Sequence, residues 1–296
     1  MNGSHVIVTH SLTKRFGRKL VLDQVDLHVP RGAIYGLIGP NGVGKTTLLR
    51  LLLNLYTPTG GGGAVLGLDI VRETVQIKRR VGHVAALQPL WEWMTVGRYA
   101  RFLAGCYHKW NQEPVSGILS RVGIKESDVI RQLSRGQRAL VSVAMAIGHG
   151  PEVLLLDEAL TGLDPLARRE VLRSVVDAMH DEGRTVLITG QDLADMERIC
   201  DYVGLLIRGR LVWESSLDEM KARVKRLRIT HPPDAAPPLP EGALAVTRET
   251  RATTFTVRDF TPDLVTSLGG NGHTIEVLDL GLEDIFVDLA RPSVEG

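Results

Sequence analysis

The sequence has few of the features that mark secreted, membrane-spanning and nucleic-acid-binding proteins. Its two cysteines, Cys106 and Cys200, form no Cys-x-x-Cys pair and are too few for a disulfide scaffold. No apolar run approaches the roughly 18 residues that span a bilayer, and residues 1–9 lack the basic and apolar regions of a signal peptide. The net charge is +1, so no global field favours nucleic acid. We therefore expect a cytoplasmic protein with reduced thiols and no nucleic-acid partner; any membrane part would belong to another chain.

What the sequence does contain is a glycine-rich stretch between two apolar segments. The run 34–38 is expected to be a buried strand, and the run 48–53 a helix. Strand, glycine loop, Lys-Thr and helix is the context of a phosphate loop. Glycines let backbone N–H groups wrap a triphosphate, and the helix start adds partial positive charge. The residues expected to bind nucleotide here are Gly39, Pro40, Asn41, Gly42, Val43, Gly44, Lys45, Thr46 and Thr47.

Four side chains are assigned chemical roles from their positions. Lys45 can reach the terminal phosphates, and the Thr46 hydroxyl can ligate Mg²⁺. Asp157 follows the apolar run 153–156, at the carboxyl end of an expected parallel strand where a carboxylate holds Mg²⁺. Glu158 can polarise an attacking water as general base. The alternative is that the two acids simply cap the following segment.

Five further residues complete the expected nucleotide contacts. Ser134, Gly136 and Gln137 open a strongly helical run, and a serine N-cap with free backbone amides makes a second anion cradle. Asp164 opens the next helix and is expected to serve as its N-cap or as a contact across subunits. Phe16 can stack on adenine, although a plain core phenylalanine is the alternative.

The expected fold class is α/β, with a phosphate-loop NTPase core, a helical subdomain and a small α+β module. Residues 1–230 form the ATP-binding domain, with a helical insert at about 89–149. Five prolines between Pro232 and Pro240 predict a stiff linker over 231–241, and 242–296 form the small domain. Segments 6–9 and 25–29 are expected to be edge strands, and the glycines at 60–63 a flexible connection.

The order of these motifs resembles the ATP-binding cassette (ABC) family over about Val6 to Val224. The resemblance implies ATP and Mg²⁺ as cofactors and two cassettes that face head to tail. ATP would lie between the phosphate loop of one cassette and Ser134 and Gly136 of the other. It also implies that Phe16 is the adenine-stacking aromatic. The tail around Leu282 to Phe286 is similar to bacterial exporter cassettes, whose polytopic membrane permease is a separate chain.

The sequence departs from the family pattern at three places. Arg135 replaces the first glycine of Leu-Ser-Gly-Gly-Gln. The family's glutamine or glutamate before the helical insert falls on Ala86, which leaves Gln88, two residues later, as the candidate ligand of Mg²⁺ or its water. The family's switch histidine falls on Gln191, whose amide can donate a hydrogen bond but cannot carry a proton. We expect sites that bind ATP and hydrolyse it slowly.

The function predicted from these residues is the energy-coupling subunit of an export complex, peripheral on the inner face of the cell membrane. A homodimer would close on ATP, and the permease would dock near residues 86–94, with Trp91 and Trp93 as contact residues; buried core tryptophans are the alternative. Two other functions stay open: a soluble cassette protein with no transport role, and an ATP-sensing cassette with little turnover.

Overall fold

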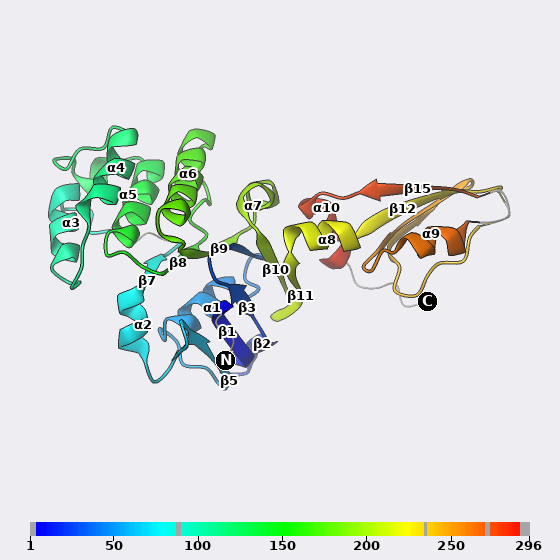
Figure 1. The fold of residues 1–296 in the computed structure, drawn as a ribbon, viewed down its shortest axis with the longest axis horizontal. Coiled ribbons are helices and arrows are strands. Elements are labelled where there is room, and N and C mark those ends of the chain that lie inside the picture. The colour runs from blue at the N-terminus through cyan, green and yellow to red at the C-terminus, as the bar shows by residue number, and fades with distance from the viewer. Residues whose placement is uncertain (1–3, 87–89, 234–235, 270–272, 291–296) are drawn as a thin grey trace. The chain divides into compact units, whose positions relative to one another are not determined.

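The chain divides into two compact units, which are described separately (Figure 1). The computed structural model describes residues 4–86, 90–233, 236–269 and 273–290, and only the backbone of residues 178–182. The first unit comprises residues 1–192 and 199–214, and the second comprises 193–198 and 215–296. Every position that the sequence analysis assigned to nucleotide binding therefore belongs to the first unit.

A six-stranded sheet forms the centre of the first unit. In spatial order its strands are β11 (Arg210–Ser216), β10 (Tyr202–Ile207), β4 (Ile34–Ile38), β9 (Thr185–Gly190), β8 (Val153–Asp157) and β7 (Val81–Val84). The strands from β10 to β7 are all parallel to their neighbours. Such sheets are covered on both faces, and β4, β8 and β9 accordingly consist of buried residues throughout. The predicted α/β class is confirmed.

A smaller antiparallel sheet corrects two expectations. Its strands are β1 (His5–Phe16), β2 (Lys19–Val25), β3 (His28–Pro30), β5 (Gly60–Val65) and β6 (Leu68–Asp69). β1 pairs with β2, β3 and β5, so it is an inner strand and not the edge strand expected at 6–9. The glycines expected to be flexible form β5, because its backbone approaches β1 closely. A Cβ on Gly61 would lie 2.2 Å from the carbonyl oxygen of Ser11.

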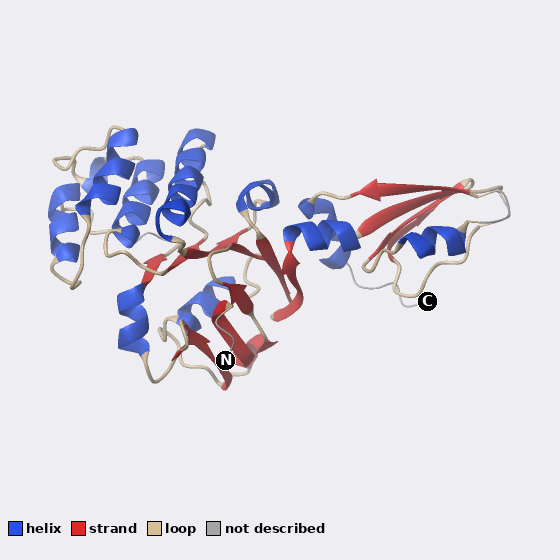
Figure 2. Ribbon diagram, in the orientation of Figure 1, coloured by secondary structure: helices blue, strands red, loops and turns tan. Residues whose placement is uncertain are grey.

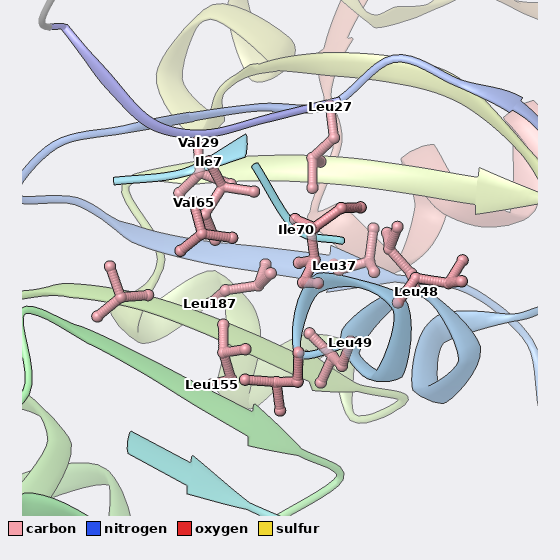
Figure 3. Packing of buried hydrophobic residues seen from close by; sticks show 14 of the residues in the cluster. Ile7, Leu27, Val29, Leu37, Leu48, Leu49, Val65, Ile70, Leu155 and Leu187 are labelled. Carbon is pink, nitrogen blue, oxygen red and sulfur yellow. The ribbon is translucent and has the colours of Figure 1, made fainter. Parts of the chain in front are cut away.

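The core of the first unit lies between the two sheets and around helix α1 (Lys45–Leu52) (Figure 3). Leu48 and Leu49 of α1 are fully buried, as are Leu155 and Leu187 of the parallel sheet. Burying each such side chain contributes about 1.5–3 kcal/mol. This packing fixes the start of α1 relative to the carboxyl ends of β4 and β8, where the site lies. Two more helices of this unit are α2 (Thr74–Arg80) and α6 (Pro165–Glu182).

A helical region separates β7 from β8 in the sequence, and Figure 2 shows no strand among its described residues. It contains α3 (Val96–Ala104), α4 (Gln112–Arg121), a short 3-10 helix (Ile130–Gln132) and α5 (Arg135–Ile147). Thr95 caps α3, because its hydroxyl accepts the Arg98 N–H. In the described part of the chain, no helix combines the length and the apolar character needed to cross a bilayer.

The second unit is a four-stranded antiparallel sheet with helices. In spatial order its strands are β13 (Leu244–Arg248), β14 (Ala252–Val257), β12 (Lys225–Thr230) and β15 (Thr274–Asp279). Leu227, Ile229, Phe255 and Val257 form its core. Its helices are α7 (Leu193–Ile199), assigned to this unit up to Arg198, α8 (Leu217–Arg223), α9 (Pro262–Leu268) and α10 (Leu282–Ala290).

The predicted domain boundary at 231–241 is corrected by this sheet. The proline-rich segment joins β12 to β13, two strands of the same sheet, so it does not separate two domains. The second unit takes up the chain at Ser215. Proline content predicts an extended backbone, but it carries no information on whether the flanking segments pair. The alternation of buried Leu227 and Ile229 with exposed Arg228 was the available signal for β12.

Candidate nucleotide-binding site

The predicted phosphate loop lies between β4 and α1, and its glycines are required by the backbone. Gly42 and Gly44 have φ angles of +73° and +120°, which other residues rarely adopt. A Cβ on Gly44 would lie 2.6 Å from Leu22 Cδ2, and one on Gly39 would lie 2.4 Å from the carbonyl oxygen of Leu206. The loop therefore brings bare backbone to the start of α1. That geometry suits a group as large and as densely charged as a polyphosphate.

The start of α1 is free to bind an anion. Gly44 is its N-cap and has no side chain that could accept the first N–H groups, and the first turn contains no acidic residue. The unsatisfied N–H groups and the helix dipole both favour a negative charge at this position. A cleft of about 110 Å³ opens here, lined by Gly42, Gly44, Lys45, Thr46, Thr47 and Glu158.

Lys45 is the cation of this cleft and is only 3% exposed. Its Nζ donates to the carbonyl oxygens of Gly39 and Pro40, at 2.8 and 3.1 Å. It also lies 3.5 Å from Glu158 Oε1. Burial lowers the pKa of Lys45, and the carboxylates of Glu158 and Asp157 oppose that shift. Lysine and glutamate are thus held against each other beside the helix start.

Asp157 ends β8, and its carboxylate connects two threonine hydroxyls. Its Oδ1 accepts hydrogen bonds from Thr46 Oγ1 at 2.9 Å and from Thr189 Oγ1 at 3.1 Å. It is 2% exposed. A carboxylate and a threonine hydroxyl in direct contact are the hard oxygen donors that Mg²⁺ prefers. The residues present therefore fit a magnesium ion held by Thr46 and Asp157, which would neutralise phosphate charge when bound.

Thr189 contacts both acids of the site, and the sequence analysis missed it. It lies on β9 directly opposite Asp157 and is 1% exposed. Its Oγ1 also accepts the N–H of Glu158 at 3.0 Å. Glu158 has a φ of +48°, a conformation that costs about 1–3 kcal/mol in a residue other than glycine. The single hydroxyl of Thr189 thus positions both acids.

The predicted second anion cradle forms a separate cluster where α5 and α6 begin. The Ser134 hydroxyl accepts the Gln137 N–H, and the Gln137 side chain accepts the Ser134 N–H, at 3.2 and 3.0 Å. Asp164 caps α6 by accepting the Ala167 N–H at 3.0 Å. A Cβ on Gly136 would lie 2.4 Å from Ala167 Cβ. This cluster does not line the phosphate cleft.

Of the remaining predicted positions, Phe16 and Gln191 are not among the residues that line the cleft. Phe16 is 42% exposed at the end of β1 and meets Tyr56 edge-on, with ring centroids 5.2 Å apart. The Lys14 ammonium lies 4.9 Å from the Phe16 ring centre. Gln191 is exposed just after β9, and Gln88 lies outside the described residues.

A phosphate-binding glycine loop, a buried lysine and a threonine–aspartate pair define a nucleoside-triphosphate-binding protein of the phosphate-loop class. The ABC transporter family matches residues 22–161. A daunorubicin resistance ATP-binding protein of Streptomyces coeruleorubidus is 37% identical over 229 residues, which cover 75% of this chain and 72% of that protein. A bacitracin transport ATP-binding protein of Enterococcus faecalis is 32% identical, with coverages of 75% and 73%. The chain belongs to the ABC transporter family and is similar to the family's ATP-binding subunits.

Two further matches bear on extent and fold. A probable multidrug ABC transporter ATP-binding protein of Escherichia coli is 34% identical over 75% of this chain, and the match spans 39% of that protein's length. A solved ATP-binding subunit of an ABC transporter is 25% identical, with a TM-score of 0.67 over 73% of this chain and 92% of its own. The phosphate-loop NTPase fold predicted from the motifs is confirmed.

Proposed function

We propose that this chain is the ATP-hydrolysing subunit of an exporter and that it couples ATP-driven dimer closure to movements of a separate polytopic permease. The observation that supports this most is the Lys45–Glu158 contact of 3.5 Å beside the glycine loop. A terminal phosphate entering the loop draws the Lys45 ammonium to its oxygens. The Glu158 carboxylate then turns to the attacking water and takes its proton.

Two variants test the hydrolytic site. Lys45→Ala should weaken MgATP binding at least about tenfold, because charge-assisted contacts to phosphate are lost. Glu158→Gln should bind MgATP as the wild type does and release no phosphate above background. Binding is measured by calorimetry and hydrolysis by phosphate release. Wild-type turnover in Lys45→Ala would refute the proposed site.

We further propose that the permease docks on an exposed aromatic patch made of Trp91, Trp93 and Phe102. The two tryptophans are 41% and 65% exposed, and their rings stack at 6.3 Å. Phe102 is 44% exposed and lies 4.4 Å from the Trp91 ring centre. Tryptophan and phenylalanine are enriched in the buried cores of protein interfaces. The prediction that Trp91 and Trp93 are contact residues is thus favoured over buried core positions.

A cavity continues this patch into the first unit. It has a volume of about 180 Å³ and is lined by His83, Val84, Ala85, Leu90, Tyr99, Leu103, Tyr107, Ser142, Met145, Ala146 and His149. Tyr99 joins it to the patch, because its ring lies 6.1 Å from that of Trp91. The volume is below the about 300–1,000 Å³ of small-molecule sites, which favours a side chain from a docking segment.

The docking proposal is tested with the membrane protein that co-purifies with this chain. Trp93→Ala should reduce recovery of that protein, while Val75→Ala, which truncates a side chain 64% exposed on α2, should leave recovery unchanged. Both variants should unfold at the wild-type temperature, because neither side chain is buried. Equal recovery with both would exclude the patch as the docking surface.

The second candidate function, an ATP-sensing cassette with little turnover, is favoured by Gln191. Its neutral amide stands where the family has a histidine. Gln191→His should raise steady-state turnover if the missing imidazole limits hydrolysis. If turnover does not rise in Gln191→His, then Gln191 is not what slows hydrolysis.

A further inference from the structure

The helix that follows Gln191 groups with the second unit. In the sequence, α7 lies between β9 and β10, two strands of the central sheet of the first unit. The chain nevertheless leaves the first unit after Asp192, re-enters it after Arg198 and leaves it again after Glu214. The second unit is therefore built around a helix that is continuous at both ends with the sheet that carries the nucleotide site.

One carboxylate, that of Glu197, attaches α7 to two other helices of the second unit. Its Oε1 lies 2.7 Å from Lys221 Nζ on α8. Its Oε2 accepts the N–H of Leu282, the first residue of α10, at 3.2 Å. Burial raises the pKa of Glu197, but the contacts with Lys221 and with the Leu282 N–H outweigh it and hold the pKa below its ordinary value. The side chain is therefore ionised at neutral pH and has a partner on each oxygen.

The same carboxylate serves as the cap of α10. Gly281 precedes this helix, and its carbonyl oxygen accepts the Ile285 N–H at 3.0 Å. Gly281 has no side chain that could accept an N–H of the first turn. A Cβ on Gly281 would lie 3.6 Å from Glu197 Oε2, so the carboxylate is directly beside the cap position. A negative charge at a helix start is stabilising, and the positions of α7 and α10 thus depend on each other.

The opposite end of α7 is close in sequence to the two acids of the site. Residues 190–192 separate Thr189, which contacts both acids, from Leu193, the first residue of α7. Even when fully extended, this segment keeps the Cα atoms of Thr189 and Leu193 within about 14 Å of each other. The ion pair between Asp192 and Arg168 on α6 restrains it further. A displacement of α7 that the segment does not absorb therefore reaches Thr189.

We propose that Glu197 is a positioning residue for ATP hydrolysis. By holding α7 to α8 and α10, its carboxylate fixes residues 190–192 and, through them, Thr189 and Gln191, so that the second unit sets the rate at which bound ATP is hydrolysed. The inference rests on the proposed function, because it concerns hydrolysis at Glu158. The glycine loop lies between β4 and α1 and does not depend on α7, so kcat should respond while the affinity for MgATP does not.

The first test compares carboxylates of the second unit. Glu197→Ala should lower kcat about 3- to 10-fold, because a displaced general base is less effective, and should leave the Kd for MgATP in calorimetry at the wild-type value. Glu197→Gln keeps an oxygen that can accept the Leu282 N–H and should lose less. The matched control is Glu219→Ala, which removes a carboxylate that pairs with Arg223 on α8 at 3.0 Å. It should change neither quantity.

A second substitution separates positioning from the capping of α10. Gly281→Ser, added to Glu197→Ala, supplies a hydroxyl at the cap position of α10 without joining that helix to α7. In hydrogen exchange it should restore the protection of α10. It should restore neither kcat nor the protection of residues 189–199, which Glu197→Ala alone is expected to lower. Recovery of kcat in the double variant would show that Glu197 merely caps α10 and would overturn the inference.

The remaining outcomes distinguish the inference from the proposed function. Faster exchange in Glu197→Ala that is confined to α10 would show that the effect does not reach residues 190–192, and the inference fails. If the wild type hydrolyses ATP and Glu197→Ala has the same kcat, the inference fails and the proposed function stands. If the wild type hydrolyses no ATP, both fail together.

Discussion

Replacing Thr189 by valine removes one hydroxyl and keeps the shape of the side chain. That hydroxyl donates to Asp157 Oδ1 at 3.1 Å and accepts the Glu158 N–H at 3.0 Å. A hydrogen bond to a charged group contributes about 1.5–3 kcal/mol, and a buried unpaired N–H costs about 1–3 kcal/mol. Because Thr46 continues to donate to Asp157, we expect a loss of about 2–4 kcal/mol of unfolding free energy.

Thr185→Val is the matched control on the same strand. Thr185 is also 1% exposed, and its hydroxyl accepts the Gly32 N–H at 2.9 Å, away from both acids. We expect it to cost about 1–2 kcal/mol, as a neutral hydrogen bond does. Urea unfolding followed by tryptophan fluorescence reports on the first unit, since Trp91, Trp93, Trp110 and Trp213 all belong to it.

The two valine variants should differ in kcat for ATP hydrolysis. Thr189→Val releases the backbone of Glu158, and a misplaced general base lowers kcat by about 10- to 100-fold. Thr185→Val should hydrolyse ATP as the wild type does at temperatures where both are folded. Equal kcat values for the two variants would refute the claim that Thr189 positions the acids.

Two further predictions concern stability. Burial lowers the pKa of His149, so the unfolded chain binds a proton that the folded chain does not; the unfolding free energy should fall as pH drops below about 6.5. His149→Phe should flatten that slope in urea titrations at several pH values, and an unchanged slope would contradict the assignment. Gly61→Ala should destabilise the first unit by more than about 2 kcal/mol, because its Cβ would lie 2.2 Å from the Ser11 carbonyl oxygen. Gly62→Ala, whose Cβ would meet nothing within 4 Å, is the control and should change the unfolding midpoint little.

The phosphate loop could be predicted from the sequence because its determinants are local. A strand, a glycine turn and a helix start are contiguous, so Gly42, Gly44 and Lys45 could be assigned without knowing the tertiary structure. Asp157 followed from one further rule, that strand ends of a parallel sheet converge. The helix caps at Ser134 and Asp164 were equally local, and their hydrogen bonds are present in the structure.

The residues that the sequence did not indicate depend on pairings between distant segments. Thr189 acquires its role only because β9 pairs with β8 in a register that sets it opposite Asp157. The close approach of β5 to β1 gives Gly61 its role in the same way. β12 was overlooked although its residues alternate between buried and exposed, and its partners, β14 and β15, come later in the chain. The domain boundary was therefore predicted at the proline-rich segment, whereas the second unit takes up the chain at Ser215.

The ion pair between Lys45 and Glu158 links the binding of nucleotide to the state of the Glu158 carboxylate. A buried ammonium needs a counter-charge, and the nearby carboxylate supplies it at 3.5 Å. A triphosphate that takes over Lys45 therefore removes the partner of Glu158. The carboxylate is left beside the phosphate with its backbone still held by Thr189. In the proposed mechanism, binding of the nucleotide and the readiness of Glu158 to act as general base are therefore the same event, and the Lys45–Glu158 distance should lengthen whenever nucleotide is bound.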